Sequence, residues 1–244
     1  MNALKFTLSG NMACFRKPET NSSCFITYSN IHKVALLGIL GAIIGLGGYS
    51  QNKEKNTYPE FYEQLKDFKI SIVPPKKNIR QKLNVFNNST GWASAEDGGN
   101  FIVKENILLN PTWDIYILEN GSIYFEKLKD YLLNQKVEFI PYLGRNDYPA
   151  NITNVEFIEL KECLDSSLIY DSLVVGNFDD IVEKELESLE DLENYEHKFL
   201  YFEKLPILLN DTFHYLYQDF LLTTDYVIKK DNSYFYKNFN LNFF

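Results

Sequence analysis

Cysteine and histidine are both scarce in this sequence of 244 residues, with three of each. The cysteines form no Cys-x-x-Cys pair, and no histidine stands at metal-ligand spacing from a cysteine or a carboxylate. A disulfide scaffold and a zinc ribbon therefore have no support. We expect a protein without a metal, in a reducing cytoplasm. The residues concerned are Cys14, Cys24, Cys163, His32, His197 and His214.

Signatures of nucleotide-binding and hydrolytic sites are missing as well. There is no Gly-x-x-x-x-Gly-Lys-Ser/Thr loop and no Gly-x-Ser-x-Gly elbow. The glycines from Gly38 to Gly48 lie inside an apolar segment and at its end, unlike those of a dinucleotide-binding loop. Residues 4–8 alternate between apolar and polar side chains, unlike a signal peptide. We expect no cofactor and no export.

Aromatic residues, in contrast, are abundant. The chain has 17 Tyr and 19 Phe, and 45% of its residues are hydrophobic. This composition argues against disorder and favours half-buried, pleated surfaces over helix bundles. The length suits one large domain or two small ones with a real core.

The net charge of −9 conceals a gradient along the chain. Residues 1–82 hold 12 Lys and Arg against 5 Asp and Glu, a net charge of +7. Residues 83–244 hold 12 against 28, a net charge of −16. Such segregation is typical of a basic binding face on a protein that is otherwise acidic. The alternative is that lysines merely solvate the first third of the chain.

Residues 33–46 form a continuous apolar run that begins at Lys33 and carries Gly38, Gly41 and Gly45 on one side at helical spacing. A helix that is apolar all round is buried or lies in a membrane. A spanning helix needs about 20 apolar residues, and this run is shorter. We therefore expect a buried helix whose small residues let a sheet approach closely, and no membrane. A membrane-associated interaction protein is the alternative.

The predicted elements alternate between strands and helices. Asn120-Gly121 indicates a hairpin turn, and residues 179–196, with nine acidic side chains, predict a solvated helix or loop. The predicted strands are 3–8, 69–73, 101–103, 113–118, 138–140, 151–160, 198–209 and 213–228, and the predicted helices are 33–46, 59–68 and 124–134. This order indicates an α+β fold with a ferredoxin-like βαββαβ unit. In RNA-recognition folds the sheet of such a unit is a platform for nucleic acid.

The best leads for binding lie near the start of the chain. If His32 and Lys33 begin the helix, its first backbone N–H groups favour a phosphate. Phe15 and Tyr28 could stack on unpaired bases, beside the basic pair Arg16-Lys17. The alternative is that both aromatic residues belong to the core and that Arg16 is a surface ion-pair partner.

Two blocks of sequence resemble a known family. Phe15-Arg16-Lys17-Pro18, then Thr27-Tyr28, then the glycine-containing run 35–46 resemble the N-terminal signature of the Cas five subunits of type I CRISPR systems, within the RAMP superfamily. Residues 141–150 resemble a second segment of that family. The sequence as a whole is most similar to the type I-B branch. The two blocks cover residues 4–50 and 138–155. Many relatives have prolines where this chain has Ser29-Asn30-Ile31-His32.

The resemblance implies an RNA-binding subunit of an antiviral Cascade complex. Its partners would be the 5′ handle of the CRISPR RNA, the backbone-forming subunit and the large PAM-reading subunit. The implied domains are a ferredoxin-like RAMP domain at 1–160, with a β-hairpin thumb inserted at about 76–120, and a small C-terminal β region at 161–244. The implied site has Arg16 and Tyr28 near the handle, Gly38 in close helix packing, and Arg145 at the end of a central strand. The full set of expected RNA-binding residues is Phe15, Arg16, Lys17, Tyr28, His32, Lys33, Lys76, Lys77, Arg80, Lys82 and Arg145.

One branch of the family, in type I-C systems, resembles a metal-independent ribonuclease that processes precursor CRISPR RNA. A Lys next to a His could supply acid–base chemistry and charge stabilisation there. The adjacent pairs in this chain, His32-Lys33 and His197-Lys198, do not fall in the middle of the sequence, where that branch carries its pair. We expect a protein that is not an enzyme, with the endoribonuclease as the alternative.

Overall fold

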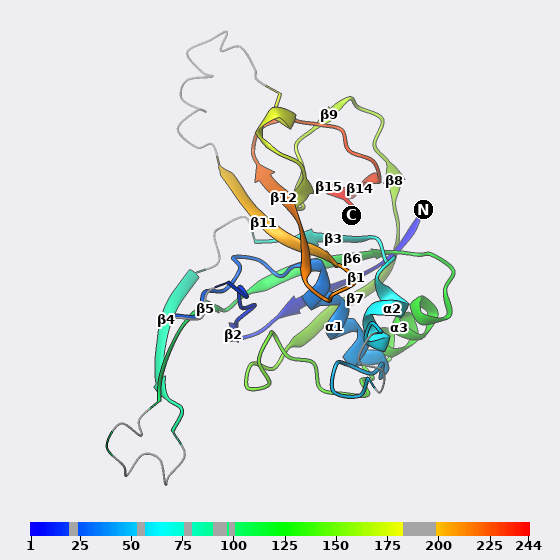
Figure 1. Cartoon of the computed structure of the whole chain (residues 1–244). Helices are drawn as coiled ribbons and strands as arrows, with labels where there is room; N and C mark the ends of the chain where they lie inside the picture. The colour runs from blue at the N-terminus through cyan, green and yellow to red at the C-terminus, as the bar shows by residue number, and fades with distance from the viewer. Residues whose placement is uncertain (20–23, 53–56, 76–79, 90–96, 98–100, 183–198) are drawn as a thin grey trace.

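The computed structural model describes residues 1–19, 24–52, 57–75, 80–89, 97, 101–182 and 199–244 (Figure 1). Its centre is a four-stranded sheet in the order β3-β6-β1-β7, with every neighbouring pair antiparallel. Leu4, Phe6 and Leu8 alternate along β1 and face the main core, as the sequence pattern predicts. The strands are β1 (Asn2–Ser9), β3 (Ile70–Val73), β6 (Thr112–Leu118) and β7 (Asn151–Glu159).

Three helices accompany this sheet: α1 (Lys33–Ile44), α2 (Glu60–Leu65) and α3 (Ile123–Leu133). The chain runs β1, α1, α2, β3, β6, α3, β7 through the sheet and its helices. This path and the antiparallel pairings are those of a β-α-β-β-α-β arrangement. The α+β class is therefore confirmed, as are the helices expected at 33–46, 59–68 and 124–134, each with slightly different ends.

Helix α1 is apolar on every side because other elements cover most of its surface, all but the side that carries Ala35, Gly38 and Ala42. It contacts α2, α3 and the C-terminal strand β11 (Leu200–Leu209), and nine of its residues are buried. Gly41 faces Phe61 of α2 so closely that a Cβ there would overlap the Cβ of Phe61. The close neighbour of the small residues is thus a helix, where we expected a sheet. No helix in the described part of the chain is long and apolar enough to cross a membrane.

A two-stranded hairpin projects from the body of the molecule between β3 and β6 (Figure 1). Its strands, β4 (Arg80–Asn87) and β5 (Ile102–Leu109), pair along their whole length, and β2 (Met12–Ala13) adds to the base of β5. We call β4 and β5 the thumb. The range predicted for the thumb, 76–120, also contains β6, which lies in the central sheet. Residues 76–79, 90–96 and 98–100 are outside the described residues.

The C-terminal part covers both sides of the central unit. Strands β11 and β12 (Tyr215–Thr223) form a hairpin that packs on α1, while β14 (Ser233–Tyr236) and β15 (Phe239–Asn242) lie against the other face of the sheet. The remaining elements are β8 (Lys161–Glu162), β9 (Ser167–Leu168), β10 (Val174–Val175), the 3₁₀ helix η2 (Phe178–Asp180) and β13 (Val227–Ile228). Most of the acidic segment 179–196, from residue 183 onward, is outside the described residues.

Two local predictions are wrong. Residues 138–140 are not a strand: the backbone N–H groups of Glu138 and Phe139 donate to the carbonyls of Ile43 and Ala42 and so satisfy the end of α1. Asn120-Gly121 does not connect two paired strands. It leads from β6 into α3, where Ser122 is the N-cap and accepts from the N–H of Phe125.

Candidate nucleic-acid interface

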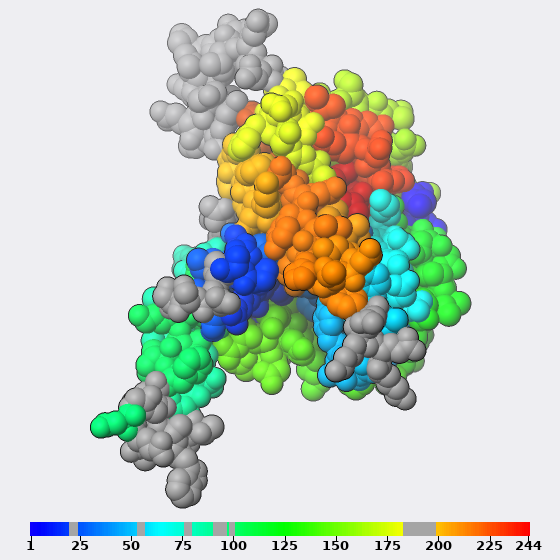
Figure 2. Space-filling view, in the orientation of Figure 1, coloured from blue at the N-terminus to red at the C-terminus, as the bar shows by residue number. Residues whose placement is uncertain are grey.

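A cavity of about 650 Å³ opens beside the thumb. Its walls come mainly from residues 14–32, the thumb, and the loop between α3 and β7, which we call the 141–149 loop, and Ala35 and Tyr215 complete them. In Figure 2 the blue surface of the N-terminal segment lies against the turquoise and green surface of the thumb. The residues discussed below that line the cavity are Phe15, Arg16, Phe25, His32, Phe86, Phe101, Glu105 and Arg145.

Arg16 is held at this cavity by Phe25. The Phe25 N–H donates to the Lys104 carbonyl at 2.9 Å, and the Asn106 N–H donates to the Phe25 carbonyl at 2.7 Å, so residue 25 adds to the edge of β5. The Arg16 guanidinium lies 3.5 Å from the centre of the Phe25 ring. Arg16 is otherwise exposed. This cation–π contact fixes the direction of an exposed positive charge beside strand β5 of the thumb.

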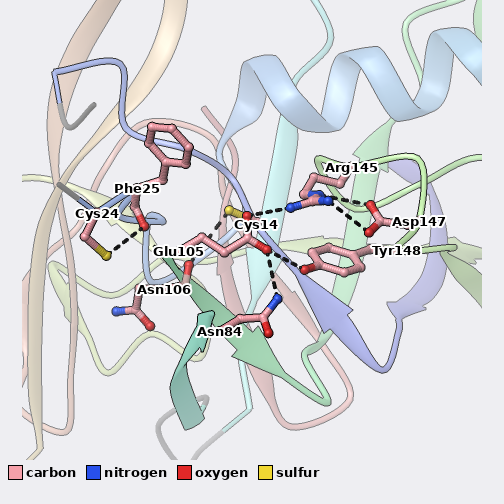
Figure 3. Close-up of polar contacts among 9 residues, drawn as sticks. All are labelled: Cys14, Cys24, Phe25, Asn84, Glu105, Asn106, Arg145, Asp147 and Tyr148. Atoms are coloured by element: carbon pink, nitrogen blue, oxygen red, sulfur yellow. Dashed lines mark hydrogen bonds and ion pairs between the residues drawn. The ribbon is translucent and has the colours of Figure 1, made fainter. Parts of the chain in front are cut away.

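Glu105 is the buried polar centre of the site (Figure 3). Its carboxylate accepts hydrogen bonds from Arg145 Nη1 at 2.6 Å, from the Tyr148 hydroxyl at 2.7 Å and from Asn84 Nδ2 at 3.3 Å. Three partners satisfy a charge that burial would otherwise penalise. Burial and the bond to Glu105 raise the pKa of Tyr148. The group ties both strands of the thumb to the 141–149 loop.

Arg145 has two carboxylates as partners. Besides Glu105, it donates from Nε and Nη2 to both oxygens of Asp147, at 2.9 and 3.0 Å. Partial burial lowers the pKa of Arg145, but the hydrogen bonds to the two carboxylates outweigh it and raise the value above the ordinary one. Arg145 lies in the 141–149 loop, and the expectation that it ends a central strand is wrong. Gly144 makes this path possible, because its φ is +85° and a Cβ would overlap the Cys14 carbonyl oxygen.

Two aromatic residues that we expected to stack on bases lie in the core. Phe15 is 3% exposed and packs on Trp113, with ring centres 6.0 Å apart. Tyr28 is 1% exposed, and its hydroxyl donates to the Tyr217 hydroxyl at 3.2 Å. The core interpretation of these rings therefore fits their positions. Phe15 still lines the floor of the cavity.

His32 caps α1 with its own side chain. The imidazole Nδ1 accepts from the N–H of Ala35 at 3.2 Å, which fills the position where we expected a phosphate. The ring is buried and meets Phe15, Tyr28 and Tyr215 edge to face. Burial lowers the pKa of His32 to about 3, so the imidazole is neutral near pH 7.

Lys33 also points inward. Its ammonium group donates to the backbone carbonyl of Phe244 at 3.3 Å, and the residue is 5% exposed. Burial, with Lys69 nearby, lowers the pKa of Lys33 to about 8. His32 and Lys33 therefore anchor the start of α1 inside the protein. The anion site that we expected there is not formed.

Of the remaining expected cations, the structure describes Lys17, Arg80 and Lys82. Lys17 pairs with Glu203 at 2.7 Å and lies over the Tyr28 ring. Arg80 and Lys82 are exposed on β4. Lys76 and Lys77 are outside the described residues.

Several residues of the site escaped the sequence reasoning. Phe25, Phe86 and Phe101 supply aromatic walls, and Phe101 is 57% exposed. Lys104 is exposed on β5, on the face of the thumb that is turned away from the cavity. The alternation of Lys82, Asn84 and Phe86 was a usable signal, since it indicates a strand with one mixed polar and aromatic face.

The face of the central sheet that we expected to be an RNA platform is covered and acidic. Tyr116 is fully buried there beneath Tyr236, and Leu241 and Phe243 pack on the same face. Its polar positions include Asp114, which accepts from Thr7, and Glu156, which pairs with Lys5. The part of this face that β14 and β15 cover cannot stack bases, and its carboxylates repel phosphates. Among the described residues no three His, Cys, Asp or Glu side chains gather as a metal site.

No protein-family model matches the sequence, and no curated protein matches it. Solved structures do match. A chain of a "CRISPR RNA-guided surveillance complex" aligns with a TM-score of 0.54 and 11% identity, over 91% of this chain and 90% of that one. A CRISPR protein from Archaeoglobus fulgidus aligns with a TM-score of 0.49 and 11% identity, over 99% of each chain. A chain of a type III-B Cmr-beta complex bound to target RNA aligns with a TM-score of 0.48 and 11% identity, over 93% and 86%. The first of these alignments shows that this chain has the fold of a subunit of a CRISPR surveillance complex.

Proposed function

We propose that this protein is a non-catalytic subunit of a CRISPR Cascade complex, resembling the Cas five family of type I-B systems, and that it binds the 5′ handle of the CRISPR RNA. The sequence blocks around Phe15-Arg16 and residues 141–150 support this proposal, as does the fold shared with a chain of a surveillance complex. Such a subunit would work in the cytoplasm, between the backbone-forming subunit and the large PAM-reading subunit.

The observation that carries the proposal is the arrangement of Arg16 at the thumb. Its guanidinium is fixed on the Phe25 ring at the mouth of a cavity lined by Phe86 and Phe101. A phosphate can bind the exposed edge of the guanidinium while an unpaired base meets an aromatic wall. Charge beside aromatic surface is the usual composition of a site for single-stranded RNA. Arg80 and Lys82 extend the positive charge along the thumb.

The absence of catalysis is part of the proposal. A metal-independent ribonuclease needs a general acid or base that reaches the 2′-hydroxyl of its substrate. The His32 imidazole is buried and engaged as a helix cap, and the Lys33 ammonium is turned toward Phe244. This pair is therefore a poor candidate for the chemistry. Incubation of the purified protein with CRISPR repeat RNA in EDTA should leave the RNA intact, and cleavage that is lost in H32A would favour the ribonuclease.

The first test is to purify the tagged protein from its host and sequence the small RNA that accompanies it. We expect discrete RNAs with one common 5′ sequence, together with other Cas subunits. Purification without RNA would contradict the proposal.

The second test measures binding of synthetic CRISPR repeat RNA over a range of salt concentrations. Arg16→Ala should weaken binding and lower the slope of log K against log salt by roughly one. Lys161→Ala removes an exposed charge from β8, far along the chain, and is the matched control. Equal affinity and equal slope for Arg16→Ala and the native protein would rule out this contact.

A further inference from the structure

A second cavity, of about 630 Å³, adjoins the one at the thumb. Both are lined by Phe15, Ala35, Gly144 and Tyr215, so the two lie side by side. The floor of the second cavity is a side of α1 that Ala35, Gly38 and Ala42 leave without bulky side chains. We call this second cavity the α1 groove.

Three exposed aromatic rings stand around the α1 groove. Tyr49 is 59% exposed, Phe139 is 58% exposed and Tyr142 is 47% exposed. Large apolar side chains that gather around a hollow at this level of exposure mark a binding site more often than a chance surface. All described residues that line the groove are uncharged.

The backbone at Phe139 and at Tyr142 is fixed by hydrogen bonding, and the Tyr49 ring packs on a neighbouring ring. Phe139 donates its backbone N–H to the Ala42 carbonyl at 3.1 Å, which fastens it to the end of α1. Tyr49 meets Phe61 edge to face, with ring centres 5.9 Å apart. Tyr142 pairs with Pro149 across the 141–149 loop. A ligand with a flat face therefore meets a surface that needs little ordering.

The charges around the groove differ between its two ends. Arg16 lines the thumb cavity at one end, where the charge of Arg145 is matched by Glu105 and Asp147. At the other end Glu60 accepts from the Gly47 N–H, and Glu138 lies beside Gly45. Phosphates are thus attracted to the first end and repelled from the second, while the interior suits an uncharged aromatic group.

We propose that the α1 groove takes an unpaired base of the same RNA strand whose phosphate binds at Arg16. This inference rests on the proposed function and deepens it. The base would stack on the rings of the rim, above the small residues of α1. Because the end of the groove near Glu60 and Glu138 is acidic, the RNA strand would not continue beyond it. An uncharged aromatic ligand fits this gradient better than an acidic or a purely aliphatic one.

Paired aromatic variants test the inference. Phe139→Ala and Tyr142→Ala should each weaken binding of CRISPR repeat RNA on the order of tenfold, because one stacking surface is lost. The salt slope should not change, since no phosphate contact is removed. Phe235→Ala, which removes a 41% exposed ring from β14, is the matched control and should bind as the native protein does.

An abasic scan of the RNA gives an independent readout. Single abasic nucleotides are placed along the repeat RNA, and each is measured with the native protein and with Tyr142→Ala. At one position the two changes should be non-additive, because the same stacking contact cannot be lost twice. Ala42→Leu, which fills the groove, should reproduce the loss, with circular dichroism and thermal unfolding used to check that α1 is intact.

The outcomes separate the two proposals. Native protein that binds no repeat RNA overturns both. Native binding that falls in Arg16→Ala, without loss in the groove variants and without a coupled abasic position, overturns the α1 groove alone. Loss of affinity with a lowered salt slope in Tyr142→Ala would mean that the groove binds phosphate, and would overturn the base assignment.

Discussion

Arg145 Nη1 donates to the buried Glu105 carboxylate at 2.6 Å and thereby joins the 141–149 loop to thumb strand β5. Residues forty positions apart in the sequence form this contact. Together with the bonds from Tyr148 and Asn84, it fixes the angle at which the thumb leaves the body. We therefore expect the pair to act on the orientation of the thumb.

Arg145→Ala should destabilise the protein by about 2 kcal/mol, because it leaves a buried carboxylate with one charged partner fewer. The partial exposure of the Arg145 side chain keeps the effect at this level. Urea unfolding measures it. Asp147→Ala removes the exposed partner of the same arginine and should cost less than about 1 kcal/mol. Equal losses in the two variants would mean that Glu105 does not depend on Arg145.

Lys33 should make stability rise with pH in mildly alkaline solution. Burial lowers its pKa to about 8, from an ordinary value of 10.5. Between these values the unfolded chain binds the proton and the folded protein does not, so stability rises with pH at up to ~1.4 kcal/mol per pH unit. Lys33→Met should remove this slope. Urea unfolding of both proteins up to about pH 9.5 makes the comparison, because the tyrosines and cysteines that also ionise in this range are common to both. Equal slopes would contradict the assignment.

His32 should affect the pH dependence of stability in acidic solution. Burial lowers its pKa to about 3, from an ordinary value of 6.5. Between these values the unfolded state takes up a proton that the folded state excludes, so stability falls as pH falls through the window. His32→Asn keeps a capping side chain without a titrating group and should fall less steeply. A native slope in His32→Asn would refute the prediction.

Two glycines of α1 should respond in opposite directions to a methyl group. At Gly38 the nearest atom to an added Cβ is Phe61 Cε2, at 3.8 Å, an ordinary contact. Gly38→Ala should therefore stabilise the helix by about 0.5–1 kcal/mol. At Gly41 the Cβ would overlap the Cβ of Phe61, and Gly41→Ala should cost about 1–3 kcal/mol. Thermal unfolding distinguishes the two signs, and a gain at Gly41 would show that α2 shifts freely.

The elements that can be predicted from the sequence are those whose own residues show a clear pattern of apolar and polar side chains. β1 alternates, α1 is uniformly apolar, and α3 combines an apolar side with an N-cap at Ser122. Each is therefore found near its expected range. Residues 138–140 look like a strand because they are apolar, but their hydrogen-bond groups go to the end of α1. The periodicity of a sequence segment cannot reveal a hydrogen-bond partner that only the tertiary structure brings close.

The residues of the candidate site could likewise be predicted only where their signal is local in the sequence. Arg16 could be singled out because charge beside aromatic residues has a local signature. Glu105 could not, because an acidic residue in a strand looks solvent-facing until Arg145 and Tyr148 are known to approach it. His32 and Lys33 look like surface residues because the residues that contact them inside the protein, Tyr215 and Phe244, come about 180 and 211 residues later in the sequence.

The covering of the sheet by β14 and β15 has a consequence for how the chain reaches its native state. Ile70 and Phe244 exchange two backbone hydrogen bonds at 3.1 Å, so the edge strand β3 gains its last partner from residues that the ribosome makes much later. Until then the second core cluster, with Tyr116 and Ile158, is open to water and to other chains. Contacts between residues this distant in sequence slow folding and prolong the exposure of apolar surface that is prone to aggregation. During synthesis the vulnerable side of this protein is thus the face that the finished molecule hides.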